Sequence, residues 1–542
     1  MKKLVAILLS ITVCLTAFVG CKGGQNQNKD AFGNTVTDQS KILDISIWNS
    51  GYGVKWINAL ANQYKQDHPG VAININEKFD QNDFNNSIQA SNTNKTDIYF
   101  NYAPNYLDKK EFIEPLDDLL AQTVEGESLT IGQKFGEKTL SALSIKENGQ
   151  TKTYALTYGS GVTGIVYNAV KFEEYGLTVP KTSNQLMSLL LQIQEETPYK
   201  GVDENNLPIT YAPMCHVSGY SSYLATNWWL QYSGSEYFNK FFTFESISEN
   251  ETFKASSDKK DISYLKNEVM SEGMQIGLQT LYDTISPQGV TASWSGDAYS
   301  TIQYNFIKND HALLYVCGGW LETELEKTDG FDMSAFNKFK MMAIPVLSDI
   351  AYKLSLGDEA TESDLIALID YVDGVTTEKP SWATDADVKL VSDARFASTS
   401  QTSSATVVVP KYSKAIELAK DFLKYMYSDA GLKLFAETQR TCLNVTPSDA
   451  NLYANIDKST WSTFSKSMYD LSSKRASTGT PQNLNHPIWY NAGRREIWVG
   501  TVPETRFTYD PSNDNFMDAE EFIDYQWGEF QKEWRTSYFK YF

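Results

Sequence analysis

The alternation of apolar and polar residues predicts strands and helices in turn near the start of the globular part. Residues 42–47 alternate as a strand, and apolar residues at helical spacing follow over 57–64. The strand pattern returns at 71–75 and 97–100, with a helix expected between them over 83–90. Strands and helices in this order are typical of a mostly parallel sheet covered by helices, so we expect an α/β fold.

The same character continues to the C-terminus. Residues 154–168 are extended in pattern and rich in Gly, and Thr182 with Gln185 predicts a capping box ahead of a helix. Two stretches do not fit the pattern: 236–264 is polar and irregular, as in a surface insertion, and 348–396 is acidic. Further elements are expected as strands over 312–317 and 406–409, an amphipathic helix over 416–426 and an aromatic-rich helix over 520–541.

The first 21 residues predict export. Two lysines precede an apolar run, residues 4–19, and a small residue stands before Cys21. This resembles a bacterial lipoprotein signal, in which the cysteine receives the lipid (typically including palmitate) and becomes the new N-terminus. A membrane-spanning helix is the alternative, but the run is shorter than the roughly 20 residues that a span needs. We expect residues 1–20 to be a signal peptide and the polar residues 21–40 to be a flexible tether from lipidated Cys21.

The net charge bears on the binding partners of the protein, and the cysteine content bears on its disulfides. The chain of 542 residues has a net charge of −20, which repels phosphate backbones, so we expect no nucleic-acid partner. Cys215, Cys317 and Cys442 are odd in number and widely spaced, which is no disulfide framework. A single Cys215–Cys442 bridge stays open.

Five segments in one order resemble the extracellular solute-binding proteins of ABC importers, the branch that includes maltose-binding protein. They are Ile47-Trp48-Asn49 with 68–71, 97–99 with 112–119, 154–156 with 167–182, 311–320 ending in Gly-Gly-Trp, and 408–425. The resemblance implies a type II periplasmic-binding-protein-like fold. In that fold two discontinuous α/β lobes are joined by hinge strands, and the ligand lies between them.

The family's chain path implies lobe boundaries. The N-terminal lobe would comprise 41–156 plus 298–346, and the C-terminal lobe 157–297 plus 347–542, with insertions near 236–264 and 348–396.

Candidate binding residues follow the predicted strands, because ligands of open α/β sheets lie at the carboxyl ends of the strands. The chain has 12 Trp and 32 Tyr, whose flat rings suit sugars. The resemblance adds Trp320 and Trp489, which match sugar-stacking Trp residues of the maltose-binding branch. Ser50 and Gly51 stand where that branch has polar binding residues, and neither is charged, so we expect a different sugar. The candidates are Trp48, Asn49, Ser50, Tyr52, Asp80, Tyr102, Tyr158, Trp229, Trp294, Asp297, Trp320 and Trp489; core packing is the alternative for Trp229 and Trp294.

One segment has the spacing of an EF-hand-like calcium loop. Oxygen ligands are expected at positions 1, 3, 5, 7, 9 and 12. These positions hold Asp510, Ser512, Asp514, Phe516, Asp518 and Glu521, and a helix is expected to follow. Asn515 stands where the motif has Gly. The alternative is an acidic loop in which Asp518 caps the last helix.

Together these features predict a non-catalytic receptor. It would capture a carbohydrate, an oligosaccharide in particular, and deliver it to the transmembrane subunits of an ABC permease. We expect a monomer anchored by lipid to the outer face of the cytoplasmic membrane, with no required cofactor beyond a possible structural Ca²⁺. Two alternatives stay open: a lipid-anchored carbohydrate-active enzyme using paired carboxylates, and a receptor for a non-sugar solute such as a peptide. No known catalytic motif is found in the sequence.

Overall fold

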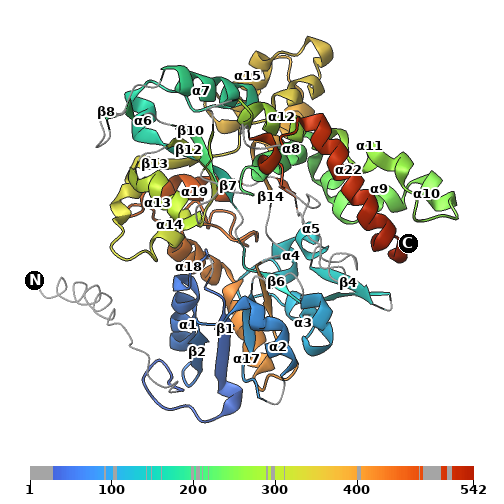
Figure 1. Ribbon diagram of the computed structural model, residues 1–542. Helices are drawn as coiled ribbons and strands as arrows, with labels where there is room; N and C mark the ends of the chain where they lie inside the picture. Colours follow the sequence, from blue (N-terminus) through green and yellow to red (C-terminus); the bar gives the residue numbers. More distant parts are fainter. Residues whose placement is uncertain are drawn as a thin grey trace, which may run out of the picture.

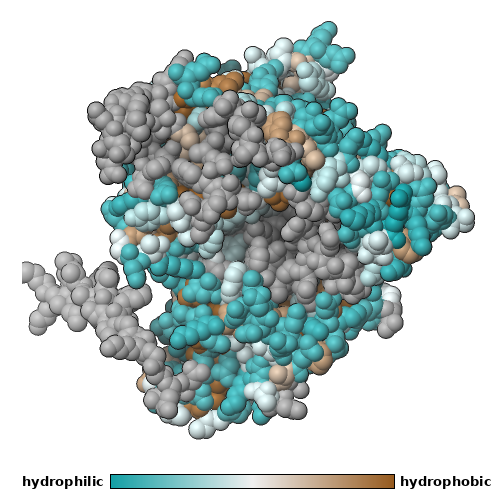
Figure 2. All heavy atoms as spheres, in the orientation of Figure 1, coloured by the Kyte–Doolittle hydropathy of each residue, from teal (hydrophilic) through white to brown (hydrophobic). Residues whose placement is uncertain are grey.

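The computed structural model describes most of the chain outside the N-terminal segment. The described residues are 28–49, 51–90, 93–101, 106–141, 143–147, 149–159, 162–196, 201–202, 208–209, 212–217, 219–287, 291–293, 299–309, 312–399, 405–474, 477–479, 502–508 and 515–542. None of the helices in these ranges is both long enough and apolar enough to cross a bilayer. Hydrophilic side chains cover most of the coloured surface in Figure 2.

The first lobe, in the lower half of Figure 1, is built on a five-stranded sheet of order β2-β1-β3-β15-β6. β1 runs parallel to β2 and β3, and Ile45 pairs with Ile75 on one side and Ile98 on the other. The predicted order of strands and helices in this region is therefore confirmed. The strands are β1 (Ile42–Ile47), β2 (Ala72–Asn76), β3 (Ile98–Asn101), β6 (Leu156–Thr157) and β15 (Thr406–Val408); the main helices are α1 (Lys55–Asp67), α2 (Phe84–Gln89), α3 (Asp117–Leu120), α4 (Ile131–Phe135), α17 (Ile416–Met426) and α18 (Asp429–Gln439).

The second lobe is built on a sheet of order β11-β10-β12-β7-β13. β12 is buried along its whole length, parallel to β10 and antiparallel to β7. The strands are β7 (Thr163–Asn168), β10 (Ala212–His216), β11 (Thr291–Ser293), β12 (Ala312–Gly318) and β13 (Phe339–Met342); helices include α7 (Ser183–Glu196), α8 (Ser222–Phe242), α12 (Glu272–Ile285), α13 (Tyr299–Asn309), α14 (Leu321–Leu325), α19 (Thr463–Ser473), α21 (Glu504–Phe507) and α22 (Ala519–Thr536).

The expected lobe boundaries were wrong for two segments. Residues 298–346, expected in the first lobe, supply β12 and β13 of the second sheet. β15, expected in the second lobe, lies between β3 and β6 in the first sheet. The cause is strand pairing over long sequence distances. β12 finds its antiparallel partner in β7, and β15 finds its own in β3.

The two predicted insertions are helical. The segment expected to be irregular over 236–264 instead holds the end of α8, α9 (Glu245–Ser248) and α10 (Glu251–Ala255). Its aromatic rings order it, because Phe244 and Phe253 pack against Trp534 of α22. The segment 348–396 holds α15 (Glu362–Asp373) and α16 (Asp385–Arg395), each opened by a Thr capping box.

The N-terminal tether begins to fold earlier than expected. We expected residues 21–40 to be flexible, but residues 28–36 form a small hairpin closed by an antiparallel bridge between Lys29 and Thr35. The Asp30 carboxylate orders the turn, because it accepts hydrogen bonds from the backbone of Phe32 and from the backbone and side chain of Asn34.

The hairpin is attached to the first lobe. Val36 is buried against Ile42 and Ala72, the first residues of β1 and β2. The Asn74 side chain donates a hydrogen bond to Asn28. The hairpin therefore lies at the amino ends of these strands.

Cys215, Cys317 and Cys442 are buried thiols that form no disulfide, so the Cys215–Cys442 bridge left open by the sequence is not formed. Burial raises the pKa of the Cys215 and Cys317 thiols, which keeps them protonated and unreactive.

Candidate ligand-binding site between the lobes

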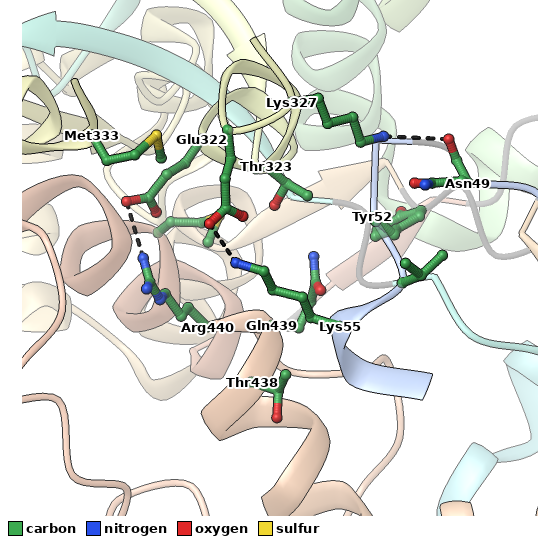
Figure 3. A pocket seen from close by; sticks show the side chains of 15 residues that line it. Asn49, Tyr52, Lys55, Glu322, Thr323, Lys327, Met333, Thr438, Gln439 and Arg440 are labelled. Carbon is green, nitrogen blue, oxygen red and sulfur yellow. Dashed lines mark hydrogen bonds and ion pairs between the residues drawn. The ribbon is translucent and has the colours of Figure 1, made fainter. Parts of the chain in front are cut away.

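A pocket of ≈ 340 Å³ lies where the two lobes meet (Figure 3), within the size range of small-molecule sites. The first lobe contributes the loop after β1, the start of α1 and the end of α18; the second contributes α14 and its neighbours. The lining residues are Asn49, Tyr52, Gly53, Val54, Lys55, Gly319, Glu322, Thr323, Glu326, Lys327, Met333, Thr438, Gln439, Arg440 and Met468.

The pocket lies at the carboxyl ends of two strands, one in each lobe. The loop after β1 carries Asn49 and Tyr52, and α14 follows directly on β12. This is the edge at which open α/β sheets bind ligands.

Charged side chains join the lobes around the pocket. Lys55 on α1 forms an ion pair with Glu326 just beyond α14, and the Lys327 ammonium donates to the Asn49 carbonyl at 3.3 Å. Figure 3 shows both contacts, together with an ion pair from Arg440 at the end of α18 to α14. Each contact pairs a residue of the first lobe with one of the second, so together they hold the lobes in this arrangement.

The Arg440 partner is Glu322, a buried carboxylate. It accepts a hydrogen bond from Arg440 at 3.1 Å, from Ser462 at 2.9 Å and from Ser465. A buried carboxylate needs such donors, because an unpaired charge is costly to desolvate. The Glu322 carboxylate is therefore held in place by three side-chain donors of the protein.

Two glycines let the loop after β1 approach α14. A Cβ on Gly51 would lie 2.8 Å from the Cβ of Trp320, and one on Gly53 would lie 2.9 Å from the Thr323 methyl. Gly53 also has φ +62°, a conformation that favours glycine. The lobes therefore touch here with no room for a side chain.

Trp320 forms an aromatic wall with Tyr220 and Tyr223 in the second lobe. Its half-buried ring meets Tyr220 edge-on at 5.9 Å and Tyr223 at 6.3 Å between ring centroids. The glycines before it are required by packing. A Cβ on Gly318 would overlap the indole ring, and one on Gly319 would press on the Met468 sulfur.

Charge at the lobe contact is partly desolvated. Burial raises the pKa of Glu324, whose carboxylate accepts a hydrogen bond from Gln303 at 2.6 Å. Burial lowers the pKa of nearby Lys327, and the Glu324 charge raises the pKa of the half-exposed Tyr299. Groups in such a setting respond strongly to a ligand that excludes water.

A second buried carboxylate lies beside the aromatic wall. Glu504 of α21 accepts a hydrogen bond from the backbone N–H of Gly219, the residue before Tyr220. Its other oxygen is buried and has no hydrogen-bond partner among the described residues. Burial raises the pKa of Glu504 to about 7.

Comparison with known families decides the class. Residues 50–337 match the family of bacterial extracellular solute-binding proteins. The chain belongs to this family. A search of curated proteins finds no match. The family match confirms the prediction of a solute-binding protein.

Solved structures share the fold of this solute-binding protein. One is a Streptococcus pneumoniae solute-binding protein in complex with the blood group A-trisaccharide, with 14% identity, a TM-score of 0.50, and 91% of this chain and 100% of that chain covered. Another is a chitin oligosaccharide binding protein, with 13% identity, a TM-score of 0.50 and coverage of 91% and 99%. A third, the solute receptor AcbH, has 14% identity, a TM-score of 0.50 and coverage of 91% and 98%. At these identities the likeness shows a common fold, and the predicted two-lobed α/β class is confirmed.

The structure brings some of the candidate binding residues of this solute-binding protein together. Asn49 and Tyr52 line the pocket, and Trp320 lies directly beside it. Trp48 instead bridges to Lys78, and Asp80 caps a short 3-10 helix.

Two candidates are core residues in this solute-binding protein. Tyr158 is buried and stacks on Trp56 at 5.6 Å inside the first lobe. Trp229 is buried against Phe238 and Phe241 in the second. Each ring is 1% exposed, so neither offers a face to a ligand, and the packing alternative holds for Trp229. Ser50, Tyr102, Trp294, Asp297, Trp489 and the lipidation candidate Cys21 lie outside the described residues.

Sequence reasoning missed Lys55 and Lys327 of the charged residues around the pocket, whereas it left Glu322 open between a functional and a solvated surface role and favoured a structural role for Arg440. Lys55, Glu322, Lys327 and Arg440 lie at helix ends, where sequence alone suggests solvated surface. One signal was present: α14 follows a buried strand ending in Gly-Gly-Trp, which places its first turn at the ligand edge of the sheet.

The calcium loop stays a prediction. Asp518 caps α22, and it exchanges hydrogen bonds with Glu521 in a capping box, which is the alternative role for Asp518. Asp510, Ser512 and Asp514 lie outside the described residues, and Phe516 contacts Tyr282 through its ring. Among the residues that the structure describes, no group of three or more acidic, His or Cys side chains is placed to hold a metal.

Proposed function

We propose that this solute-binding protein is the capture component of an ABC importer, that its ligand is an oligosaccharide, and that it delivers this ligand to a membrane permease without chemical change. The observation that carries the proposal is the pocket between the lobes, with an aromatic wall beside it. A ligand that touches both lobes favours the closed arrangement, and this couples binding to a change in shape.

The chemistry of the wall suits a sugar. Trp320, Tyr220 and Tyr223 offer apolar ring surface, and charged and amide side chains around the pocket offer partners for hydroxyls. Two proteins of the same fold are described with a chitin oligosaccharide and a blood group trisaccharide as ligands. This supports an oligosaccharide here.

Binding without catalysis agrees with the state of the pocket carboxylates. Glu322 is engaged by Arg440 and Glu326 by Lys55, each from the other lobe. A glycosidase instead needs a pair of carboxyl groups free to flank the scissile bond.

The protein works at the outer face of the cytoplasmic membrane, as a monomer held by lipid on Cys21. The short charged start, the apolar run and the cysteine support this anchor. More than one acyl chain is needed for stable attachment.

Calorimetric titration against a glycan panel tests the proposal, with product analysis to exclude turnover. We expect one glycan series to bind, and Trp320→Ala to weaken its binding at least tenfold, because stacking on an aromatic ring is lost. Tyr237→Ala is the control, since this ring is 69% exposed on the far part of α8. Binding of only non-sugar solutes, or equal affinity of the Trp320→Ala variant, would contradict the sugar assignment.

A further inference from the structure

The ordered hairpin at residues 28–36 shortens the tether between Cys21 and the first lobe. Only residues 22–27 separate Cys21 from Asn28, where the hairpin begins. Seven steps of extended chain span at most about 25 Å. The tether expected to run to residue 40 would have reached about 65–70 Å.

The hairpin presents an apolar side chain at its turn. The Phe32 side chain is 70% exposed. The Asp30 carboxylate is engaged within the turn, where it accepts hydrogen bonds from the backbone N–H groups of Phe32 and Asn34. The stretch 28–41 is balanced in charge, since Lys29 and Lys41 are offset by Asp30 and Asp38. An exposed aromatic ring suits the interface of a bilayer, where the ring enters the acyl boundary.

The hairpin and the ligand pocket lie at opposite ends of the first lobe. The hairpin packs on Ile42 and Ala72 at the amino ends of β1 and β2, whereas the pocket follows the carboxyl end of β1. β1 has six residues, a rise of about 20 Å.

We propose that the hairpin is a membrane-contact element, in which Phe32 inserts into the bilayer surface next to the lipid on Cys21. The inference rests on the lipid anchor of the proposed function. The acyl chains supply the affinity, and the ring fixes which end of the first lobe faces the membrane. In this pose the ligand pocket is directed away from the bilayer, open to solutes from outside.

The test uses the full chain, purified in its lipidated form and reconstituted into phosphatidylglycerol–phosphatidylethanolamine vesicles. An environment-sensitive fluorophore is attached at Phe32→Cys or at Val375→Cys, a matched site that is 72% exposed in the second lobe. The three native thiols that the structure describes are buried and do not compete for the label. We expect emission at position 32 to shift to the blue and to rise at least twofold on vesicles, with no change at position 375.

A second measurement keeps the native ring. Hydrogen exchange of residues 28–36 should slow at least threefold on vesicles in the wild type, and not in Phe32→Asp. If mass analysis shows the lipid and the protein floats with vesicles, but position 32 stays aqueous and exchange is unchanged, the membrane contact is refuted while the anchor stands. Equal fluorescence changes at 32 and 375 would also refute it. Absence of lipid on Cys21 would refute the anchor and this inference together.

Discussion

Adding one methyl group at Gly51 should weaken ligand binding without unfolding the protein. Its Cβ would stand 2.8 Å from the Trp320 Cβ and 3.0 Å from a Glu324 oxygen, whereas ordinary contacts begin at 3.4 Å. The loop and α14 must therefore separate by about 0.6 Å. Trp320 cannot absorb this shift by rotating, because the clash is with its Cβ, and its ring is packed over Gly318.

This separation changes the relative position of the lobes. It therefore destabilises the bound state, in which the ligand contacts both lobes. The loop and α14 both line the pocket, so we expect this separation to cost about a tenfold loss of affinity, or about 1.4 kcal/mol. The φ of Gly51 lies outside the left-handed region, so alanine brings no backbone strain there. The thermal midpoint should stay within a few degrees of the wild type.

Calorimetric titration with the ligand found in the glycan panel measures the effect. Gly528→Ala is the matched control, because nothing lies within 4 Å of a Cβ at this helical position. That control should bind normally and gain about 0.5–1 kcal/mol of stability from helix propensity. Wild-type affinity in Gly51→Ala would refute the argument that the lobes are in contact here when ligand is bound.

Three further substitutions probe stability. Burial raises the pKa of Glu504 from its ordinary value of 4.5 to about 7, so the protonated form is favoured in the fold. The free energy of unfolding should therefore fall by about 3 kcal/mol as pH rises from 4.5 through 7, and thermal melts of Glu504→Gln should lack this fall. Lys134 is buried between Glu127 and Asp429, so Lys134→Met should cost about 3–5 kcal/mol in urea unfolding; an unchanged midpoint would contradict this. Although burial opposes it, hydrogen bonds hold the pKa of Asp387 at about 2. The protection factors of α15 and α16, which correct for the intrinsic exchange rate, should therefore fall as pH falls from 3.8 through 2, and less so in Asp387→Asn.

The elements of the fold could be predicted from local pattern, but the lobe to which each belongs could not. The alternation that predicts β12 and β15 describes a buried strand in either sheet. Their partners, β7 and β3, lie far away in sequence, and only the three-dimensional packing selects them. Because each lobe is discontinuous, one error in where the chain passes between the lobes assigned both 298–346 and β15 to the wrong lobe.

For the site, the motif around Trp320 was informative because its two glycines are both required by packing. Aromatic residues elsewhere were not, since a ring such as that of Trp229 or Tyr158 suits a core as well as a sugar. The ion pairs between the lobes could not be predicted, because Lys55 and Arg440 acquire their partners only when the lobes meet.

Because the hairpin is weakly attached, the length of the tether depends on the equilibrium between the docked hairpin and the open chain. One small apolar cluster, one bridge and a few hydrogen bonds hold residues 28–36, so local opening costs far less than global unfolding. Opening frees the chain as far as Ile42 and extends the reach from about 25 Å to about 70 Å. A receptor with two tether lengths can collect solute at one height above the membrane and turn its pocket toward a permease at another height.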